Sequence, residues 1–213
     1  MNKVYKRRII RPVKSPPTAA PVRRRNAGAT REAILASARA AFARAGYDGV
    51  GVREIARGAG VTAMLVNRYF GSKEQLFAEV CAATMATPTI LTEAILNSPA
   101  PGDAIAAALV EQTKAGAIPL DGFLIMLYSA SSKRAAEIGR EQIERHHHKV
   151  MTAALRGDRA AERAALVLSL VAGVQVMRQM IGLSALAKAE PRALAKILGS
   201  MLQQLVEGER PRR

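Results

Sequence analysis

The sequence is poor in cysteine, aromatic residues and long apolar runs. Its single cysteine, Cys81, excludes an internal disulfide and suits a reducing compartment, and its apolar helical surroundings predict a buried small side chain rather than a redox sensor. Tryptophan is absent, and aromatic residues make up 4% of the 213 residues. The longest apolar run, Ala164–Val176, lies between Arg163 and Arg178 and falls short of the roughly 20 residues that span a membrane. We therefore expect a soluble, cytoplasmic protein.

Acidic residues are missing from the first 29 residues, which hold nine lysines and arginines. The whole chain has 32 basic and 17 acidic residues and a net charge of +15, so this segment carries much of the excess. It also contains four prolines and no periodic apolar face, and we expect residues 1–29 to be a disordered basic arm. A concentrated positive charge of this kind suits a polyanion such as nucleic acid.

Strand-forming patterns are also scarce, whereas alanine, leucine and other helix formers dominate. Prolines and glycines lie mostly between the helical patterns. These features predict an all-α protein. The first helix is expected to begin near Thr30, which serves as its N-cap. Ser72 and Gln75 have capping-box spacing for the start of a fourth helix, which should end before Pro88. Further helices are expected near residues 89–97, 103–115, 121–131, 133–156, 160–186 and 191–207.

The segment Val52–Phe70 predicts two short helices joined by a tight turn. Ala56 is small enough for the second helix to cross close above it, and Gly60 lies where the chain must turn sharply and positive φ costs least. Thr62 can cap the second helix through its hydroxyl group. This arrangement is a helix-turn-helix, whose second helix enters the major groove of DNA. DNA is therefore the leading candidate partner.

Val61, Val66 and Phe70 are expected to form the inward side of this second helix, which leaves its other face for DNA. Asn67 can pair with adenine, and Arg68 with guanine or a phosphate. The expected DNA contacts, drawn from the arm, the second helix and the turn after it, are Arg23, Arg24, Arg25, Thr62, Ala63, Met64, Asn67, Arg68, Tyr69 and Lys73. The alternatives are solvated surface charge for the basic residues and packing for Met64.

Two apolar seams near the C-terminus repeat at spacings of three and four residues, which is typical of helices that pack in a two-fold bundle. Gly173 would let two helix backbones approach closely. The expected dimer interface comprises Leu166, Leu170, Gly173, Met177, Met180, Leu194, Leu198, Met201 and Leu205. The alternative for both seams is a core within one chain.

A cavity for a small hydrophobic ligand is also expected in this C-terminal part, because adaptable methionines and aromatic residues gather there. Its expected lining is Phe123, Met126, Leu127, Tyr128, Met151 and Met177, with plain core packing as the alternative. No catalytic set stands out, so an enzyme is not expected, and neither is a cofactor. Consecutive histidines His146, His147 and His148 point about 100° apart on a helix, so they cannot chelate one metal ion together.

The stretch from Ile55 to Phe77, IARGAGVTAMLVNRYFGSKEQLF, resembles the N-terminal domain of the TetR/AcrR family of bacterial transcriptional regulators. The match includes Gly60, Thr62 and the run from Tyr69 to Glu74. The resemblance implies a homodimeric all-α repressor with a DNA-binding head and a C-terminal domain that binds a small molecule and forms the dimer. The sequence departs from the family pattern at Gly51, Met64, Leu65 and Asn67, which affects operator contact rather than the fold.

We therefore expect a disordered basic arm at 1–29, a helix-turn-helix domain at 30–80, a ligand-binding and dimerisation domain at 81–207 and a tail at 208–213. The expected function is a homodimeric repressor that a small hydrophobic ligand releases from a palindromic operator. The alternative is a ligand-independent, architectural DNA-binding protein that relies on its basic arm.

Overall fold

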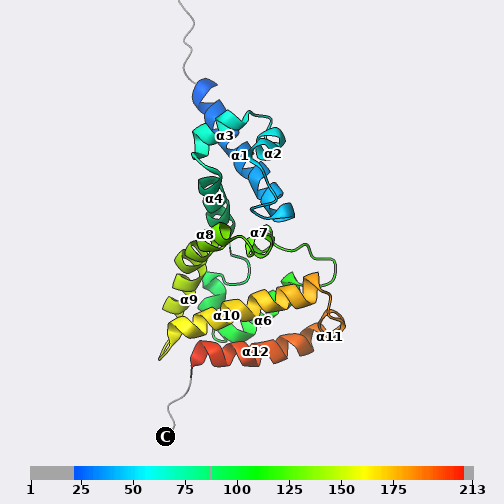
Figure 1. Cartoon of the computed structure of the whole chain (residues 1–213). Helices are drawn as coiled ribbons and strands as arrows, with labels where there is room; N and C mark the ends of the chain where they lie inside the picture. Colours follow the sequence, from blue (N-terminus) through cyan, green and yellow to red (C-terminus); the bar gives the residue numbers. More distant parts are fainter. Residues whose placement is uncertain (1–21, 87, 209–213) are drawn as a thin grey trace, which may run out of the picture.

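The computed structural model describes residues 22–86 and 88–208, with side chains from Ala27 onward, and every regular element in this part is a helix. The all-α prediction is confirmed. Helices α1 (Val22–Ala45), α2 (Val52–Gly58) and α3 (Ala63–Phe70) form a head, and α4 (Lys73–Met85) leads from it into a larger body (Figure 1). The body comprises α5 (Glu93–Leu96), α6 (Pro101–Gln112), α7 (Asp121–Ser129), α8 (Lys133–Ile143), the π-helix η1 (Glu144–His148), α9 (Lys149–Ala154), α10 (Ala160–Val174), the π-helix η2 (Gln175–Met180), α11 (Ser184–Ala187) and α12 (Pro191–Glu207).

Helix α1 begins at Val22 and not near Thr30, so the expected start of the first helix is wrong. Pro21 is the last proline of the basic segment, and the residues after it are mostly arginine and alanine, which favour helix. Part of the segment predicted to be a disordered arm is therefore helical. The rest of that prediction, for residues 1–21, lies outside the described residues.

The core of the head is built around three aromatic rings. Phe42 and Phe77 meet edge to face with ring centroids 5.1 Å apart, and Tyr47 lies 5.0 Å from Phe77. Ile55 is fully buried beside them, and so is Cys81. Burial raises the pKa of the Cys81 thiol to about 12, so this side chain stays protonated and serves as a small apolar residue.

The hydrophobic core of the head extends into the body rather than ending at a linker. Ile125 of α7 and Ile138 of α8 are buried in the same cluster as the residues of α1 and α4. The backbone N–H of Tyr47 donates a hydrogen bond to Ser129 Oγ over 2.9 Å, and this bond is buried. Helix α7 is thus held against the end of α1.

Gly46, directly after α1, lies against the backbone of α7. Its φ is +66°, and a Cβ atom added there would lie 2.3 Å from the carbonyl oxygen of Tyr128. We expect Gly46→Ala to lower the free energy of unfolding by about 2–4 kcal/mol, from positive φ and from overlap with backbone. Urea unfolding measures the loss.

Gly28 is the matched control for this substitution. It lies on the exposed part of α1, and a Cβ atom there would meet nothing within 4 Å. We expect Gly28→Ala to raise the free energy of unfolding by about 0.5–1 kcal/mol through helix propensity. Equal effects at the two glycines would contradict the contact between α1 and α7.

The body is organised around α6 and α12, which pack closely along their length. A Cβ atom at Gly102 of α6 would lie 2.3 Å from the backbone nitrogen of Gln203, so only glycine permits this approach. Helix α10 lies against α12 (Figure 1). Leu109 of α6, Val167 of α10 and Leu202 of α12 are fully buried in one cluster.

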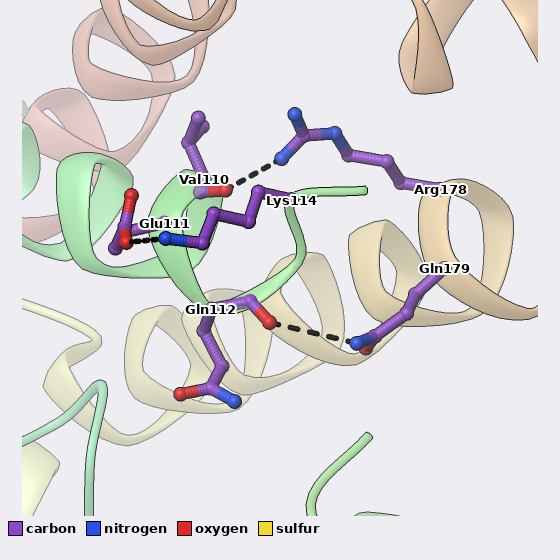
Figure 2. Close-up of polar contacts among 6 residues, drawn as sticks. All are labelled: Val110, Glu111, Gln112, Lys114, Arg178 and Gln179. Carbon is purple, nitrogen blue, oxygen red and sulfur yellow. Dashed lines mark hydrogen bonds and ion pairs between the residues drawn. The ribbon is translucent and has the colours of Figure 1, made fainter. Parts of the chain in front are cut away.

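Two buried arginines hold the ends of these helices. Arg163 donates to the carbonyl oxygens of Leu205 and Val206 at the end of α12, over 2.9 and 3.1 Å. Arg178 of η2 donates to the carbonyl of Val110 at the end of α6 over 2.7 Å (Figure 2). A cation at a helix C-terminus is favourable because it meets unpaired carbonyl groups and the negative end of the helix dipole.

Candidate DNA-binding surface and ligand cavity

The turn between α2 and α3 has the geometry that the sequence predicts. Gly60 has a φ of +67°, and the hydroxyl oxygen of Thr62 accepts a hydrogen bond from the backbone N–H of Leu65 over 3.3 Å. Ala56 is buried where α3 crosses α2, and Val66 and Phe70 form the buried edge of α3. Gly51, at the N-cap of α2, provides no side-chain cap. The two helices therefore form a helix-turn-helix.

The outward face of α3 carries four of the expected DNA contacts. Thr62, Met64, Asn67 and Arg68 are exposed, and Met64 is 80% exposed. A large apolar side chain so open to water does not pack within the chain, so the packing alternative for Met64 does not hold. This face of α3 is open to solvent.

The remaining expected contacts differ in their surroundings. Ala63 and Tyr69 are partly buried against the core of the head. The ammonium group of Lys73 lies 4.1 Å from the ring centroid of Tyr47, where the cation–π attraction holds it. The side chains of Arg23, Arg24 and Arg25 lie outside the described residues.

Tyr47 and Glu74 change each other's pKa. Burial, and then a hydrogen bond with Glu74, raises the pKa of the Tyr47 phenol to about 12. The pKa of the Glu74 carboxyl group is lowered by hydrogen bonds from its own backbone N–H, from Ser72 and from Tyr47, in that order. Ser72 also accepts from the backbone N–H of Gln75 over 3.2 Å, the cap expected for α4.

A cavity of about 620 Å³ lies in the body next to the head. Its mostly apolar wall is formed by the end of α4, the segment after it, α7, η1 and the region where α10 meets η2. The lining residues are Arg39, Thr84, Met85, Pro88, Thr89, Ile90, Leu91, Leu120, Asp121, Gly122, Phe123, Met126, Leu127, Ile143, His147, Leu168, Val171, Ala172, Gln175 and Val176. This volume is typical of small-molecule sites.

Three of the six residues expected at a ligand site lie in this lining, namely Phe123, Met126 and Leu127. The other three do not. Tyr128 is on another face of α7 and is 46% exposed, Met151 is buried in the core of the body, and Met177 is 41% exposed on the outer face of η2. Apolar character alone does not distinguish a cavity wall from core or surface.

Six polar residues of the lining were not predicted from the sequence, namely Arg39, Thr84, Thr89, Asp121, His147 and Gln175. Arg39 Nε of α1 donates to Asp121 Oδ2 of α7 over 2.7 Å, so this pair joins head and body at the cavity. His147 comes from η1 and Gln175 from η2. The sequence carries no clear signal for the π-helical turns, which are frequent at functional sites.

The three consecutive histidines point to different surroundings, as their helical spacing predicts. His147 lines the cavity, and burial followed by the charge of His146 lowers its pKa, so its imidazole is neutral at pH 7. His148 Nε2 lies 2.9 Å from the carbonyl oxygen of Ala161. No group of three metal-ligating side chains occurs in the part of the chain that the structure describes.

Large apolar side chains are exposed on α10, η2 and α12, which are neighbouring helices of the body. Leu166 and Met177, on α10 and η2, are 54% and 41% exposed, and Ile197 and Met201, on α12, are 62% and 47% exposed. Gly173 lies on the same side of α10 with open space above it. We call this set the α10–α12 face.

Part of the expected dimer interface is wrong. Leu194 and Leu198 are buried in the core against α6 and cannot reach a partner, because the inward side of α12 also repeats at helical spacing. Ile197, next to Leu198, is exposed but was not among the expected interface residues, because both sides of α12 carry apolar residues at helical spacing. Leu170, Met180 and Leu205 are partly buried beside the α10–α12 face.

The continuous helix Ala160–Met180 is long and apolar enough to cross a membrane by length and composition, and it is the one such helix in the described part. Only 33% of its most apolar window is buried. The exposed part of this helix includes Leu166, Gly173 and Met177 of the α10–α12 face.

Comparison with known proteins identifies the family. A family model described as bacterial regulatory proteins, tetR family, matches residues 34–80, and one described as the tetracyclin repressor-like C-terminal domain matches residues 101–206. No curated protein matches the sequence significantly.

Solved structures with the same fold cover most of this chain. A TetR-family regulator from Streptomyces coelicolor is 24% identical, with a TM-score of 0.54 over 84% of this chain and 95% of the other. A putative TetR-family transcriptional regulator from Rhodococcus is 15% identical, with a TM-score of 0.63 over 84% and 100%. NalD, the secondary repressor of the MexAB-OprM multidrug efflux pump in Pseudomonas aeruginosa, is 18% identical, with a TM-score of 0.57 over 85% and 98%. The two domain matches and the helix-turn-helix geometry together show that this chain belongs to the TetR family of DNA-binding transcriptional regulators.

Proposed function

We propose that this protein is a homodimeric repressor that a small, mainly apolar ligand releases from a palindromic operator. The observation that carries the proposal is the position of α7, which lines the cavity and packs against α1 of the head. A ligand that repositions α7 changes the head, and in a dimer it changes the spacing of the two recognition helices. A ligand shifts the equilibrium only by its differential affinity for the two states.

The contacts between α7 and α1 support the proposed coupling between cavity and head. The Arg39–Asp121 pair lies at the cavity, while Ser129 at the other end of α7 accepts from the backbone of Tyr47. Gly46 meets the backbone of Tyr128 beside it. Helix α7 therefore contacts the head at both ends, and its own middle carries Phe123 and Met126 into the cavity wall.

Dimerisation is proposed through the α10–α12 face. Large apolar side chains gathered on one surface are typical of a protein interface. A single head buries too little surface for tight and specific DNA binding, whereas two heads can occupy half-sites one helical turn apart. On each recognition helix, Asn67 and Arg68 are proposed to read bases, with Thr62, Ala63 and Met64 beside them and Tyr69 and Lys73 at phosphates.

The test combines a thermal-shift screen of neutral apolar compounds with operator binding by the full-length protein. A compound that raises the melting temperature and also weakens operator binding supports the proposal. Ala172→Trp, which introduces a large side chain into the cavity from α10 rather than from α7, should remove both effects while leaving operator binding in the absence of ligand. Compounds that bind without any change in operator affinity would favour the ligand-independent alternative.

The basic arm is proposed to add sequence-independent affinity. A chain that begins at Val22 keeps α1 whole and loses six basic residues, namely Lys3, Lys6, Arg7, Arg8, Arg11 and Lys14. We expect it to bind all DNA sequences more weakly and with a shallower salt dependence, because each lost phosphate contact removes about 0.9 from the slope of log K against log salt. Preference for the operator should remain. Titrations at several salt concentrations measure both, and an unchanged slope would refute a role for the arm.

A further inference from the structure

The polar groups of the cavity wall favour neutral ligands over charged ones. Of its charged lining residues, Arg39 and Asp121 already pair with each other over 2.7 Å. His147 is neutral at pH 7 because burial lowers its pKa. The wall therefore offers neither an unpaired cation to a carboxylate nor an unpaired anion to an amine, and the remaining surface is mostly apolar.

Gln175 is the polar residue of the wall whose hydrogen bonding is incomplete. It is 5% exposed, and its Nε2 donates to the carbonyl of Val171 over a long 3.4 Å. Its Oε1 is buried without a hydrogen-bond partner. Exchanging the two amide atoms would bring Oε1 against the Val171 carbonyl oxygen, so the observed orientation is the favourable one. A buried acceptor without a donor is costly, and a ligand that supplies the donor recovers that cost.

The other end of η2 is anchored and cannot serve the cavity. Arg178 donates to the Val110 carbonyl and to Thr113 Oγ1, and Gln179 Nε2 donates to the carbonyls of Gln112 and Ala117. Figure 2 shows Arg178 and Gln179 reaching the end of α6 from adjacent positions of η2. Gln175, on the preceding turn, is left for the cavity. The long bond to Val171 lets its carboxamide turn at little cost.

We propose that the cavity selects a neutral, largely apolar molecule that carries a hydrogen-bond donor, such as a hydroxyl or N–H group, and that Gln175 Oε1 accepts from this donor. The neutral imidazole of His147, from the π-helix η1, lies in the same wall, and its N–H can donate to the oxygen of a ligand hydroxyl group. The inference rests on the proposed ligand site and specifies its chemistry.

The test measures displacement of N-phenylnaphthylamine, a neutral fluorescent probe, from the full-length protein. The competitors are octanol and its isomer methyl heptyl ether, which has an acceptor but no donor, with octanoate and octylammonium as charged counterparts. We expect octanol to bind about ten-fold more tightly than the ether, the discrimination expected of one neutral hydrogen bond, and more tightly than either ion.

Gln175→Met retains the size of the side chain and removes the acceptor. It should bring octanol and the ether within about two-fold of each other, and its melting temperature should equal or exceed that of the wild type, because an unpartnered oxygen is lost. Gln179→Met is the matched control: it alters the same π-helix outside the cavity and should keep the preference for octanol.

The outcomes separate the two proposals. Equal binding of octanol and the ether to the wild type, tighter binding of either ion, or a preference that survives Gln175→Met would overturn the donor inference and leave the ligand site standing. Failure of the probe and of every competitor to bind would overturn the ligand site itself.

Discussion

Replacing Leu166 and Met177 together by glutamate should give a folded monomer that no longer binds the operator tightly. Both side chains are about half exposed, so the two substitutions should lower the folding stability of the isolated chain only slightly. In a dimer formed through the α10–α12 face, the four introduced carboxylates would be buried without partners, which opposes association strongly. We expect operator affinity to fall about a thousand-fold or more, towards the level of non-specific binding.

Sedimentation and operator titration on the same preparation measure this effect. Ile118→Glu is the control, because Ile118 is 81% exposed and lies between α6 and α7, outside the α10–α12 face. The control should remain dimeric and bind normally. If the double variant stays dimeric, the dimer interface does not lie on the α10–α12 face.

Removing the side chain of Asn67 or Arg68 should have the next largest effect, and it should be specific to sequence. Both residues are exposed on α3, and a bidentate contact to a base contributes about 1–3 kcal/mol. A dimer presents each residue twice, so the loss at a palindromic operator is about 2–6 kcal/mol, or roughly 30-fold to more than ten-thousand-fold in affinity.

Parallel titrations of operator and scrambled DNA distinguish base reading from charge. Asn67→Ala and Arg68→Ala should weaken operator binding far more than binding to scrambled DNA. Arg145→Ala, which removes an exposed charge from η1 in the body, should change neither. Equal losses of affinity for operator and scrambled DNA would show that these residues contact phosphates and do not read bases.

The helix-turn-helix could be predicted closely because its signals are local. Gly60 at positive φ and the Thr62 and Ser72 caps depend on a few neighbouring residues, and the structure has each of them as expected. The predicted start of α1 is wrong because proline and charge, which indicate disorder, do not exclude helix as far as residue 29. Beyond Pro21 no proline interrupts the helix, and the arginines and alanines there outweigh the low helix propensity of Gly28.

The body was harder to predict because its helices have two apolar faces. On α12, Leu194 and Leu198 repeat at the same spacing as Ile197 and Met201, and only the position of α6 decides which pair is buried. The cavity depends even more on tertiary structure. Gln175 and His147 reach it from π-helical turns, and Arg39 reaches it from the head, far away in the sequence.

The measurement that tests the account most directly is selection of bound DNA from a random pool by the full-length protein. A dimeric regulator with two recognition helices should select an inverted repeat, with half-sites whose separation matches one helical turn. A pool enriched without a consensus, or with a single unrepeated half-site, would contradict the account and favour an architectural DNA-binding protein.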